Sequence, residues 1–163
     1  MSKPGLCAWI LALTLLTPLA ARADAKPINL SLFTPIQIFP ADASIHGFRF
    51  TLFYAVNHEM HGFDFGLVNR ATGSVMGFQW GLVNVGESLM EGVQFGFVNY
   101  LGGDDSGGTG LQWGFVNYSP RFSGVQLGFV NITDELHGMQ LGVINIAKNG
   151  FLPVFVLFNS NFD

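Results

Sequence analysis

The chain has 163 residues, of which 49% are apolar and 11% are charged, whereas a typical soluble domain has roughly 25% charged residues. Its 17 phenylalanines, three tryptophans and three tyrosines provide too much apolar surface for an intrinsically disordered chain. The formal net charge of −4 excludes the basic surface by which proteins bind nucleic acid or an anionic membrane.

Residues 1–23 have the pattern of a secretory signal peptide. Lys3 precedes an apolar run at residues 6–16, and the small-residue triplet Ala21-Arg22-Ala23 follows it. The run is shorter than the roughly 20 residues that a membrane-spanning helix needs. We therefore expect cleavage after Ala23 and export of residues 24–163 as a single domain. That mature chain would contain no cysteine, because Cys7 lies in the apolar run.

Two short segments at the ends of this domain have strand patterns that differ from the rest. Residues 28–32 alternate apolar and polar side chains, and Pro35 then interrupts the pattern, as at a sheet edge or a bend. Residues 153–158 form an apolar run that predicts a final strand. Atypical ends of this kind are typical of the capping units of a repeat protein.

The body of the chain is one repeated motif, Gly-x-Gln-x-Gly-x-x-Asn, which covers about residues 45–146. The first of six regular copies begins at Gly62, and a degenerate copy before them begins at Gly47. Successive motif asparagines are 15, 15, 18, 14 and 14 residues apart, and the extra residues fall in the glycine-rich segment 102–108, an expected surface loop. The residues that define the repeat are Gly62, Gly66, Asn69, Gly77, Gln79, Gly81, Asn84, Gly92, Gln94, Gly96, Asn99, Gly110, Gln112, Gly114, Asn117, Gly124, Gln126, Gly128, Asn131, Gly138, Gln140, Gly142 and Asn145.

Within each motif, large apolar side chains alternate with glycine or a polar residue, which is the period-two pattern of a β-strand. Phe63, Phe65 and Leu67, for example, share one face of the predicted strand. A soluble monomer does not leave an apolar surface of this size in water. The large face must therefore contact a protein core, a partner or lipid.

The motif, with its recurrence about every 15 residues, resembles that of a family of bacterial exported surface-repeat proteins first named from a leptospiral protein. The resemblance spans roughly Ile45 to Phe162 and implies a cell-envelope or surface location. It implies no established activity and no catalytic residues. The first copies depart from the family pattern, at Arg49, Thr51, Tyr54 and Asp64, which indicates that this end is specialised.

The pattern is compatible with three all-β architectures. The favoured one is an antiparallel meander that closes into a small outer-membrane barrel, with the large side chains facing lipid and Gly and Gln facing inward. The alternative is a β-solenoid that stacks Gln on Gln and Asn on Asn, with Phe, Trp and Leu inside a narrow coil. The third is a soluble meander or sandwich that buries its large face against itself.

The sequence contains few groups that could carry chemistry. His58, Glu59 and His61 superficially resemble a metal-binding motif, but their spacing is one residue short of His-Glu-x-x-His, so no metal site is predicted. Arg49 and Asp64 replace the motif glutamine in the first two copies. If consecutive motifs are neighbouring strands, these charges face one another and form an ion pair.

The sequence therefore predicts a non-enzymatic, exported cell-envelope protein with a structural or adhesive role, without cofactor or metal. The expected contacts are outer-membrane lipid or a surface partner, with no small-molecule substrate and no nucleic acid. The alternative function is a secreted or periplasmic binding module that uses its Gly/Gln face or its loops to hold a partner.

Overall fold

The computed structural model describes residues 25–103 and 105–163, which are built of β-strands and contain no helix. The predicted signal peptide lies outside the described residues. In the part of the chain that the structure describes, no helix is long and apolar enough to cross a membrane. The strands are β1 (Lys26–Phe33), β2 (Ile36–Gln37), β3 (Ile45–Asn57), β4 (Met60–Ala71), β5 (Val75–Gly86), β6 (Leu89–Phe95), β7 (Val98–Leu101), β8 (Gly107–Trp113), β9 (Val116–Leu127), β10 (Val130–Ala147) and β11 (Val154–Asn161).

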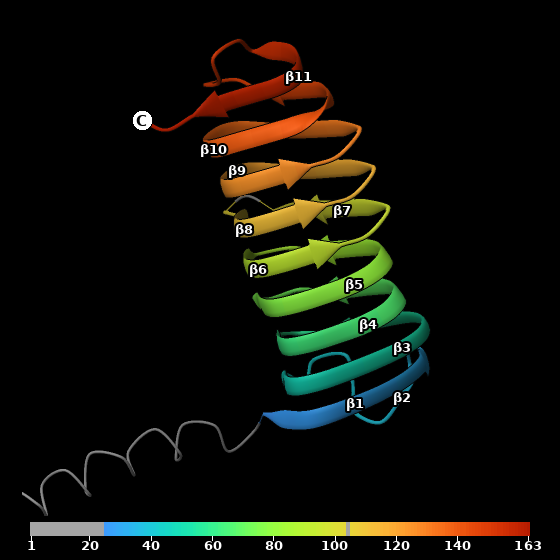
Figure 1. Ribbon diagram of the computed structural model, residues 1–163. Helices are drawn as coiled ribbons and strands as arrows, with labels where there is room; N and C mark the ends of the chain where they lie inside the picture. Colours follow the sequence, from blue (N-terminus) through green and yellow to red (C-terminus); the bar gives the residue numbers. More distant parts are fainter. Residues whose placement is uncertain (1–24, 104) are drawn as a thin grey trace, which may run out of the picture.

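The chain winds into a β-solenoid, in which each repeat forms one coil stacked on the coil before it (Figure 1). Neighbouring coils pair in parallel from β1 to β10, and the motif residues stay in register: Gly62 pairs with Gly77, Asp64 with Gln79 and Asn69 with Asn84. The register survives the longer segment before β8, because Gln94 still pairs with Gln112. Period-two strands, a constant motif length and variable loops together produce this stacking.

The prediction of an antiparallel meander closed into a barrel is wrong. Each motif continues through a bend into the second arm of its own coil and then returns to the next coil, so that consecutive motifs run in the same direction (Figure 1). Antiparallel pairing occurs only at the two ends of the described stack, where β2 pairs with β1 and β11 pairs with β10. The predicted alternative, a β-solenoid, is the architecture of the described residues. That prediction was wrong in one respect, because it placed Phe, Trp and Leu inside the coil, whereas most of these side chains lie outside.

The interior of the solenoid holds the polar side chains and the exterior holds the large apolar ones. The motif glutamines and asparagines are fully buried, whereas Phe63, Trp80 and Phe97 are about half exposed. A coil of about 15 residues leaves little room for rings, and Phe122, which pairs with Gly108 of the preceding coil, is the one aromatic side chain that is fully buried among the described residues. Glutamine and asparagine fit because each pairs with its equivalent in the next coil. Small or flexible apolar residues, among them Ala71, fill the rest of the interior.

Two ladders of side-chain amides run the length of the repeats in opposite directions. In the glutamine ladder, each Nε2 donates to the Oε1 of the preceding coil, as Gln112 does to Gln94 at 2.9 Å. In the asparagine ladder, each Nδ2 donates toward the following coil, as Asn84 does to Asn99 at 2.9 Å. These bonds satisfy groups that would otherwise be costly to bury.

The first motif glycine has a conformational reason to recur. At Gly92, φ is +129°, and a Cβ atom would lie 2.0 Å from the carbonyl oxygen of Gly77 in the coil below. A residue with a side chain would be strained and would clash with backbone that cannot move aside. The motif therefore keeps glycine where adjacent coils come closest.

Candidate functional site

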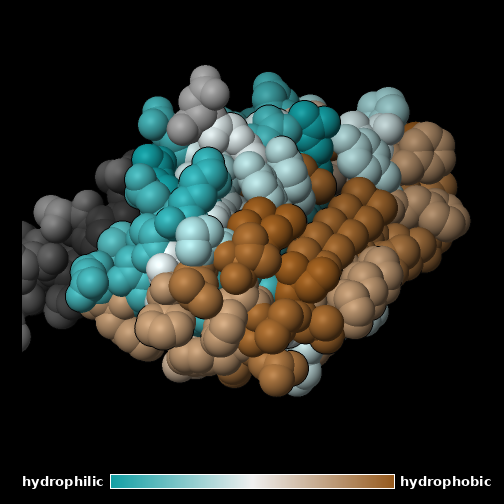
Figure 2. Space-filling model, turned by 90° about the horizontal axis from the view of Figure 1, so that it is seen from above, coloured by the Kyte–Doolittle hydropathy of each residue, from teal (hydrophilic) through white to brown (hydrophobic). Residues whose placement is uncertain are grey.

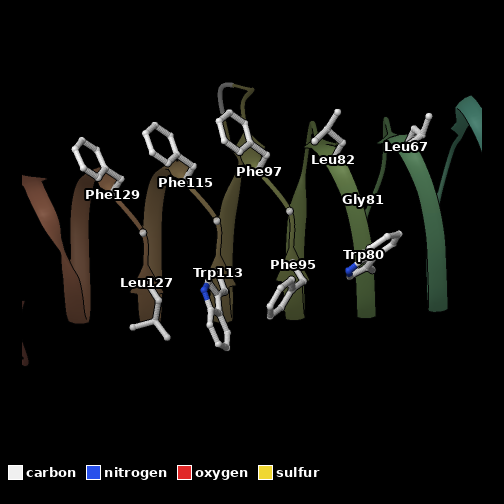
Figure 3. A pocket seen from close by; sticks show the side chains of 13 residues that line it. Leu67, Trp80, Gly81, Leu82, Phe95, Phe97, Trp113, Phe115, Leu127 and Phe129 are labelled. Carbon is white, nitrogen blue, oxygen red and sulfur yellow. The ribbon is translucent and has the colours of Figure 1, made fainter.

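The outward-facing apolar side chains form an apolar groove that runs along the solenoid (Figure 3). Large residues just before and just after the second motif glycine make its two walls, and the glycines Gly81, Gly96, Gly114 and Gly128 make its floor. The groove has a volume of about 780 Å³, within the usual range for small-molecule sites. Its walls are Trp80, Phe95, Trp113 and Leu127 on one side and Leu67, Leu82, Phe97, Phe115 and Phe129 on the other.

Stacking of equivalent side chains in adjacent coils orders the walls. The rings of Phe97 and Phe115 are 4.9 Å apart at 5°, and those of Phe115 and Phe129 are 4.8 Å apart at 5°. On the opposite wall, the rings of Phe95 and Trp113 are 4.7 Å apart. The solenoid register thus creates continuous apolar ridges from a motif repeated along the chain.

A second cavity of about 520 Å³ extends the groove toward the N-terminal coils. Leu67 and Trp80 line both cavities, and Phe48, Phe50 and Leu52 line the extension. The lining residues of both cavities extend from the coil of β3 to the bend after β9. The apolar groove therefore crosses five steps between coils, each about 4.8 Å, and is roughly 24 Å long. No charged side chain lines either cavity.

The backbone of the groove floor is already hydrogen-bonded. The amides of Gly96, Gly114 and Gly128 donate to carbonyls of the following coils, at 2.9 to 3.0 Å. An extended peptide would need free backbone donors and acceptors in order to add as a strand. The groove instead offers apolar walls, which suit a hydrocarbon chain.

Polar residues gather on the side of the solenoid away from the hydrophobic surface, as Figure 2 shows in a view along the stack. Arg70 and Glu87 form an ion pair outside the coils, with Arg70 Nε 2.7 Å from Glu87 Oε1. Hydrogen bonds to the Tyr54 hydroxyl and the Glu87 carboxylate raise the pKa of Arg70 above its usual value. The molecule is therefore amphipathic across its width.

The two charged residues that replace the motif glutamine lie in the interior, not in the groove. Arg49 and Asp64 are fully buried and form a bidentate ion pair, with Nε–Oδ1 and Nη2–Oδ2 distances of 2.7 and 2.6 Å. Gln79 donates to Asp64 at 2.7 Å, and Arg49 also donates to Asn57 and to the carbonyl of Arg70. The ion pair ends the glutamine ladder and has no access to a ligand.

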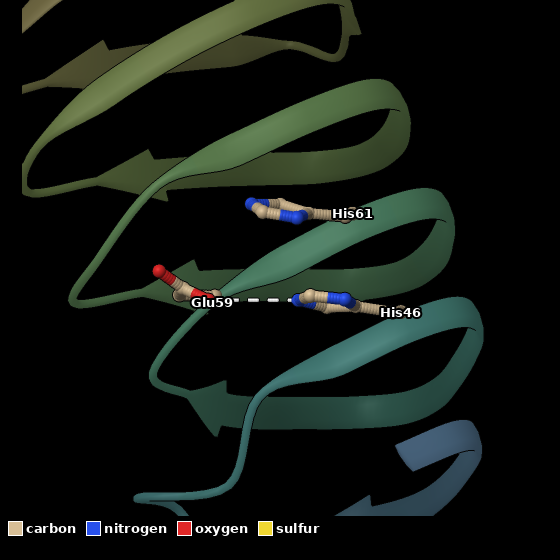
Figure 4. Close-up of side chains that lie close together, drawn as sticks. All are labelled: His46, Glu59 and His61. Atoms are coloured by element: carbon tan, nitrogen blue, oxygen red, sulfur yellow. Dashed lines mark ion pairs between the residues drawn. The ribbon is translucent and has the colours of Figure 1, made fainter. Parts of the chain in front are cut away.

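One cluster of metal-ligating residue types occurs among the described residues: His46, Glu59 and His61 (Figure 4). It overlaps the His58–His61 segment noted in the sequence, but His46 of the preceding coil takes the place expected for His58. His58 instead lies 3.3 Å from the Thr72 hydroxyl. Sequence spacing missed this cluster because the solenoid register, which aligns His46 with His61, brings the two imidazoles together.

The repeat residues predicted from the sequence occupy two places. The second glycines of four repeats form the groove floor, whereas every motif glutamine and asparagine lies inside, so that a Gln face is not available to a partner. The groove walls were missed as a site, although the alternation had already indicated one large apolar face. The chain matches no model of a known protein family, no curated protein and no solved structure.

Proposed function

We propose that this chain is an exported, non-enzymatic β-solenoid that attaches to a lipid bilayer by inserting its apolar side among the acyl chains. The main observation in support is the apolar groove, a continuous surface of stacked aromatic and aliphatic ridges without a charged residue. Soluble monomers rarely expose contiguous apolar patches larger than a few hundred Å². The predicted signal peptide supports export, and the amphipathic cross-section supports attachment at a membrane surface (Figure 2).

Lipid chains fit the surface better than a polypeptide does. The backbone amides of the groove floor are bonded within the solenoid, so a peptide strand would find no partners there. Flexible methylene chains can fill a groove between ridges, whereas a second rigid copy would have to match the ridges in register. Continuation of the stack by a second copy is also disfavoured at the C-terminal end of the described solenoid, because β11 runs antiparallel along β10 there.

The net charge predicts which lipids bind. Because the chain is acidic and the groove is uncharged, attraction to anionic headgroups contributes nothing, and binding should follow the burial of apolar surface. Vesicles of neutral phosphatidylcholine should therefore bind the protein at least as well as vesicles that contain phosphatidylglycerol, and added salt should not release it.

The two tryptophans in the described residues both line the groove, which makes their fluorescence a direct probe. Addition of phosphatidylcholine vesicles should shift their emission to shorter wavelength, and the protein should float with the vesicles in a density gradient. Leu82→Ser should weaken vesicle binding several-fold. Leu89→Ser is the matched control, because Leu82 and Leu89 are each 54% exposed but Leu89 lies outside the groove.

Three results would overturn the proposal. The first is unchanged emission and no flotation with either vesicle type. The second is a stable dimer in buffer whose tryptophan emission is already at short wavelength and does not respond to lipid, which would assign the apolar side to a second copy. Equal binding by the Leu82→Ser and Leu89→Ser variants would remove the groove from the contact.

A further inference from the structure

The solenoid brings three metal-ligating side chains together near its N-terminal end, on residues that have nothing to do with the apolar groove. His46 and His61 each precede the first glycine of their repeats and pair directly in the parallel register of β3 and β4. Glu59 lies in the turn that enters β4. One ligand atom from each of the three residues can be chosen so that all lie within 4.8 Å of one another (Figure 4).

The His46 ring makes the strongest case that this cluster is incomplete without a ligand. Both of its ring nitrogens are shielded from solvent and have no hydrogen-bond partner. Nε2 lies 3.5 Å from Glu59 Oε2, within ion-pair range but without hydrogen-bond geometry. An imidazole nitrogen that is hidden from water and lacks a partner is costly to bury, and a bound cation is one way to satisfy it.

The surroundings position the second imidazole. The His61 ring stacks on the His46 ring, with centroids 4.3 Å apart and planes at 23°. His61 Nε2 lies 2.9 Å from the Ser74 hydroxyl in the turn that follows β4. Hydrogen bonds of this kind to one ring nitrogen orient a histidine that binds a metal through the other.

We propose that His46, Glu59 and His61 form a binding site for a divalent transition-metal ion of the zinc class. Two imidazoles and a carboxylate are donors that zinc accepts, at about 2.0–2.2 Å each. Ligand atoms around a tetrahedral ion are about 3.3 Å apart, so the three side chains must close inward from their present separations. They can do so by side-chain rotation, because the His46 and Glu59 side chains keep exposures of 24% and 34%.

A metal ion at this site would join the coil of β3 to the coil of β4. The fourth tetrahedral position would remain open to water or to a donor from a partner, since the three residues supply three ligand atoms. The site would thus cross-link two coils where the interior ladder changes from glutamine to the Arg49–Asp64 pair. The proposal is independent of lipid binding, because no residue of the cluster lines the groove.

Two histidines outside the cluster provide control variants. The chain has four histidines, two inside the cluster and two outside it. His58 contacts Thr72, and His137 lies 2.9 Å from the carbonyl oxygen of Asp163. The variants His58→Gln and His137→Gln therefore remove an imidazole without touching the site.

The test is to titrate zinc chloride into residues 24–163 and to measure the heat of binding by calorimetry. The protein is purified without a polyhistidine tag and is freed of metal with EDTA. One zinc ion per chain should bind, and the same addition should raise the midpoint of thermal unfolding. His46→Gln, His61→Gln and Glu59→Gln should each weaken zinc binding at least tenfold, whereas the two control variants should bind as the unaltered chain does.

The proposal is overturned if zinc does not bind, if the three cluster variants bind it undiminished, or if the control variants lose affinity equally. Circular dichroism of each metal-free variant separates loss of the site from loss of the fold. If a histidine variant does not fold, Glu59→Gln still decides the question, because this side chain is partly exposed and lies outside the strands.

Discussion

The first two repeats and the five that follow bury a polar side chain at the same position of the coil in different ways. In the later repeats, five glutamines donate one to the next, and each interior member has one neighbour on either side. In the first two, Arg49 and Asp64 are held by a bidentate ion pair. A neutral ladder thus depends on hydrogen bonds to its neighbours in the stack. In the charged step, the ion pair compensates two buried charges, and hydrogen bonds with Gln79, Asn57 and the Arg70 carbonyl supplement it.

The junction between the two regions has a physical logic. All amides of the glutamine ladder point their donors toward the N-terminal end, so that the series ends on an acceptor, the Asp64 carboxylate. Aligned hydrogen bonds polarise one another, and an anion at the acceptor end of such a series is favourable. Arg49 then compensates the buried negative charge.

The largest expected effect comes from breaking the charged step. Asp64→Asn leaves the Arg49 guanidinium buried without a counter-charge and should lower the free energy of unfolding by about 3 kcal/mol or more, measured by urea denaturation. Arg49→Gln in the same chain should restore part of this loss, because two neutral amides then extend the ladder. Simple additivity of the two substitutions would contradict the coupling.

The exposed ion pair provides the control for that experiment. Arg70 and Glu87 have side-chain exposures of 41% and 35%. Glu87→Gln should therefore cost about 1 kcal/mol at most, because water and salt screen such a pair. The contrast with Asp64→Asn isolates the effect of burial from that of pairing.

A smaller effect is expected inside the neutral ladder, and it should depend on position. Gln112→Leu leaves Gln94 Oε1 without its donor and Gln126 Nε2 without its acceptor. It should lower the free energy of unfolding by about 2–3 kcal/mol, measured by urea denaturation. Gln140→Leu removes the donor to Gln126 Oε1 and to the carbonyl oxygen of Ile146, while the Gln140 Oε1 atom itself lacks a partner. It should cost less, about 1–2 kcal/mol, because it leaves only acceptors without a partner, whereas Gln112→Leu also leaves the Gln126 donor without one. Equal losses would show that the ladder bonds are not the source of the effect.

The smallest effect on stability is expected at the outer surface. Leu82→Ser and Leu89→Ser should each change the free energy of unfolding by about 0.5 kcal/mol or less, because both side chains are half exposed. A large loss at Leu82 alone would mean that the groove walls hold the coils together, and the vesicle experiment would then need a different variant.

Part of the candidate site could be expected from the sequence. The alternation around Trp80 and Phe97 predicted one continuous apolar face, and this face is the groove wall. The His46–Glu59–His61 cluster was missed because the search for metal ligands used the local spacing of residues 58–61, whereas His46 lies 15 residues before His61 and meets it in the parallel register. The facing of Arg49 and Asp64 followed from the repeat period, under the condition that consecutive motifs are neighbours.

The sequence by itself determined that the chain forms strands, that the strands repeat, and that identical side chains can align in neighbouring strands. Only the tertiary structure decided that the strands run parallel and that the polar face points inward. Period-two alternation defines two faces without saying which is buried. The choice follows from the narrow coil, which cannot hold a large aromatic or aliphatic side chain at every motif position, and from amides in register, which satisfy one another's hydrogen bonds when buried.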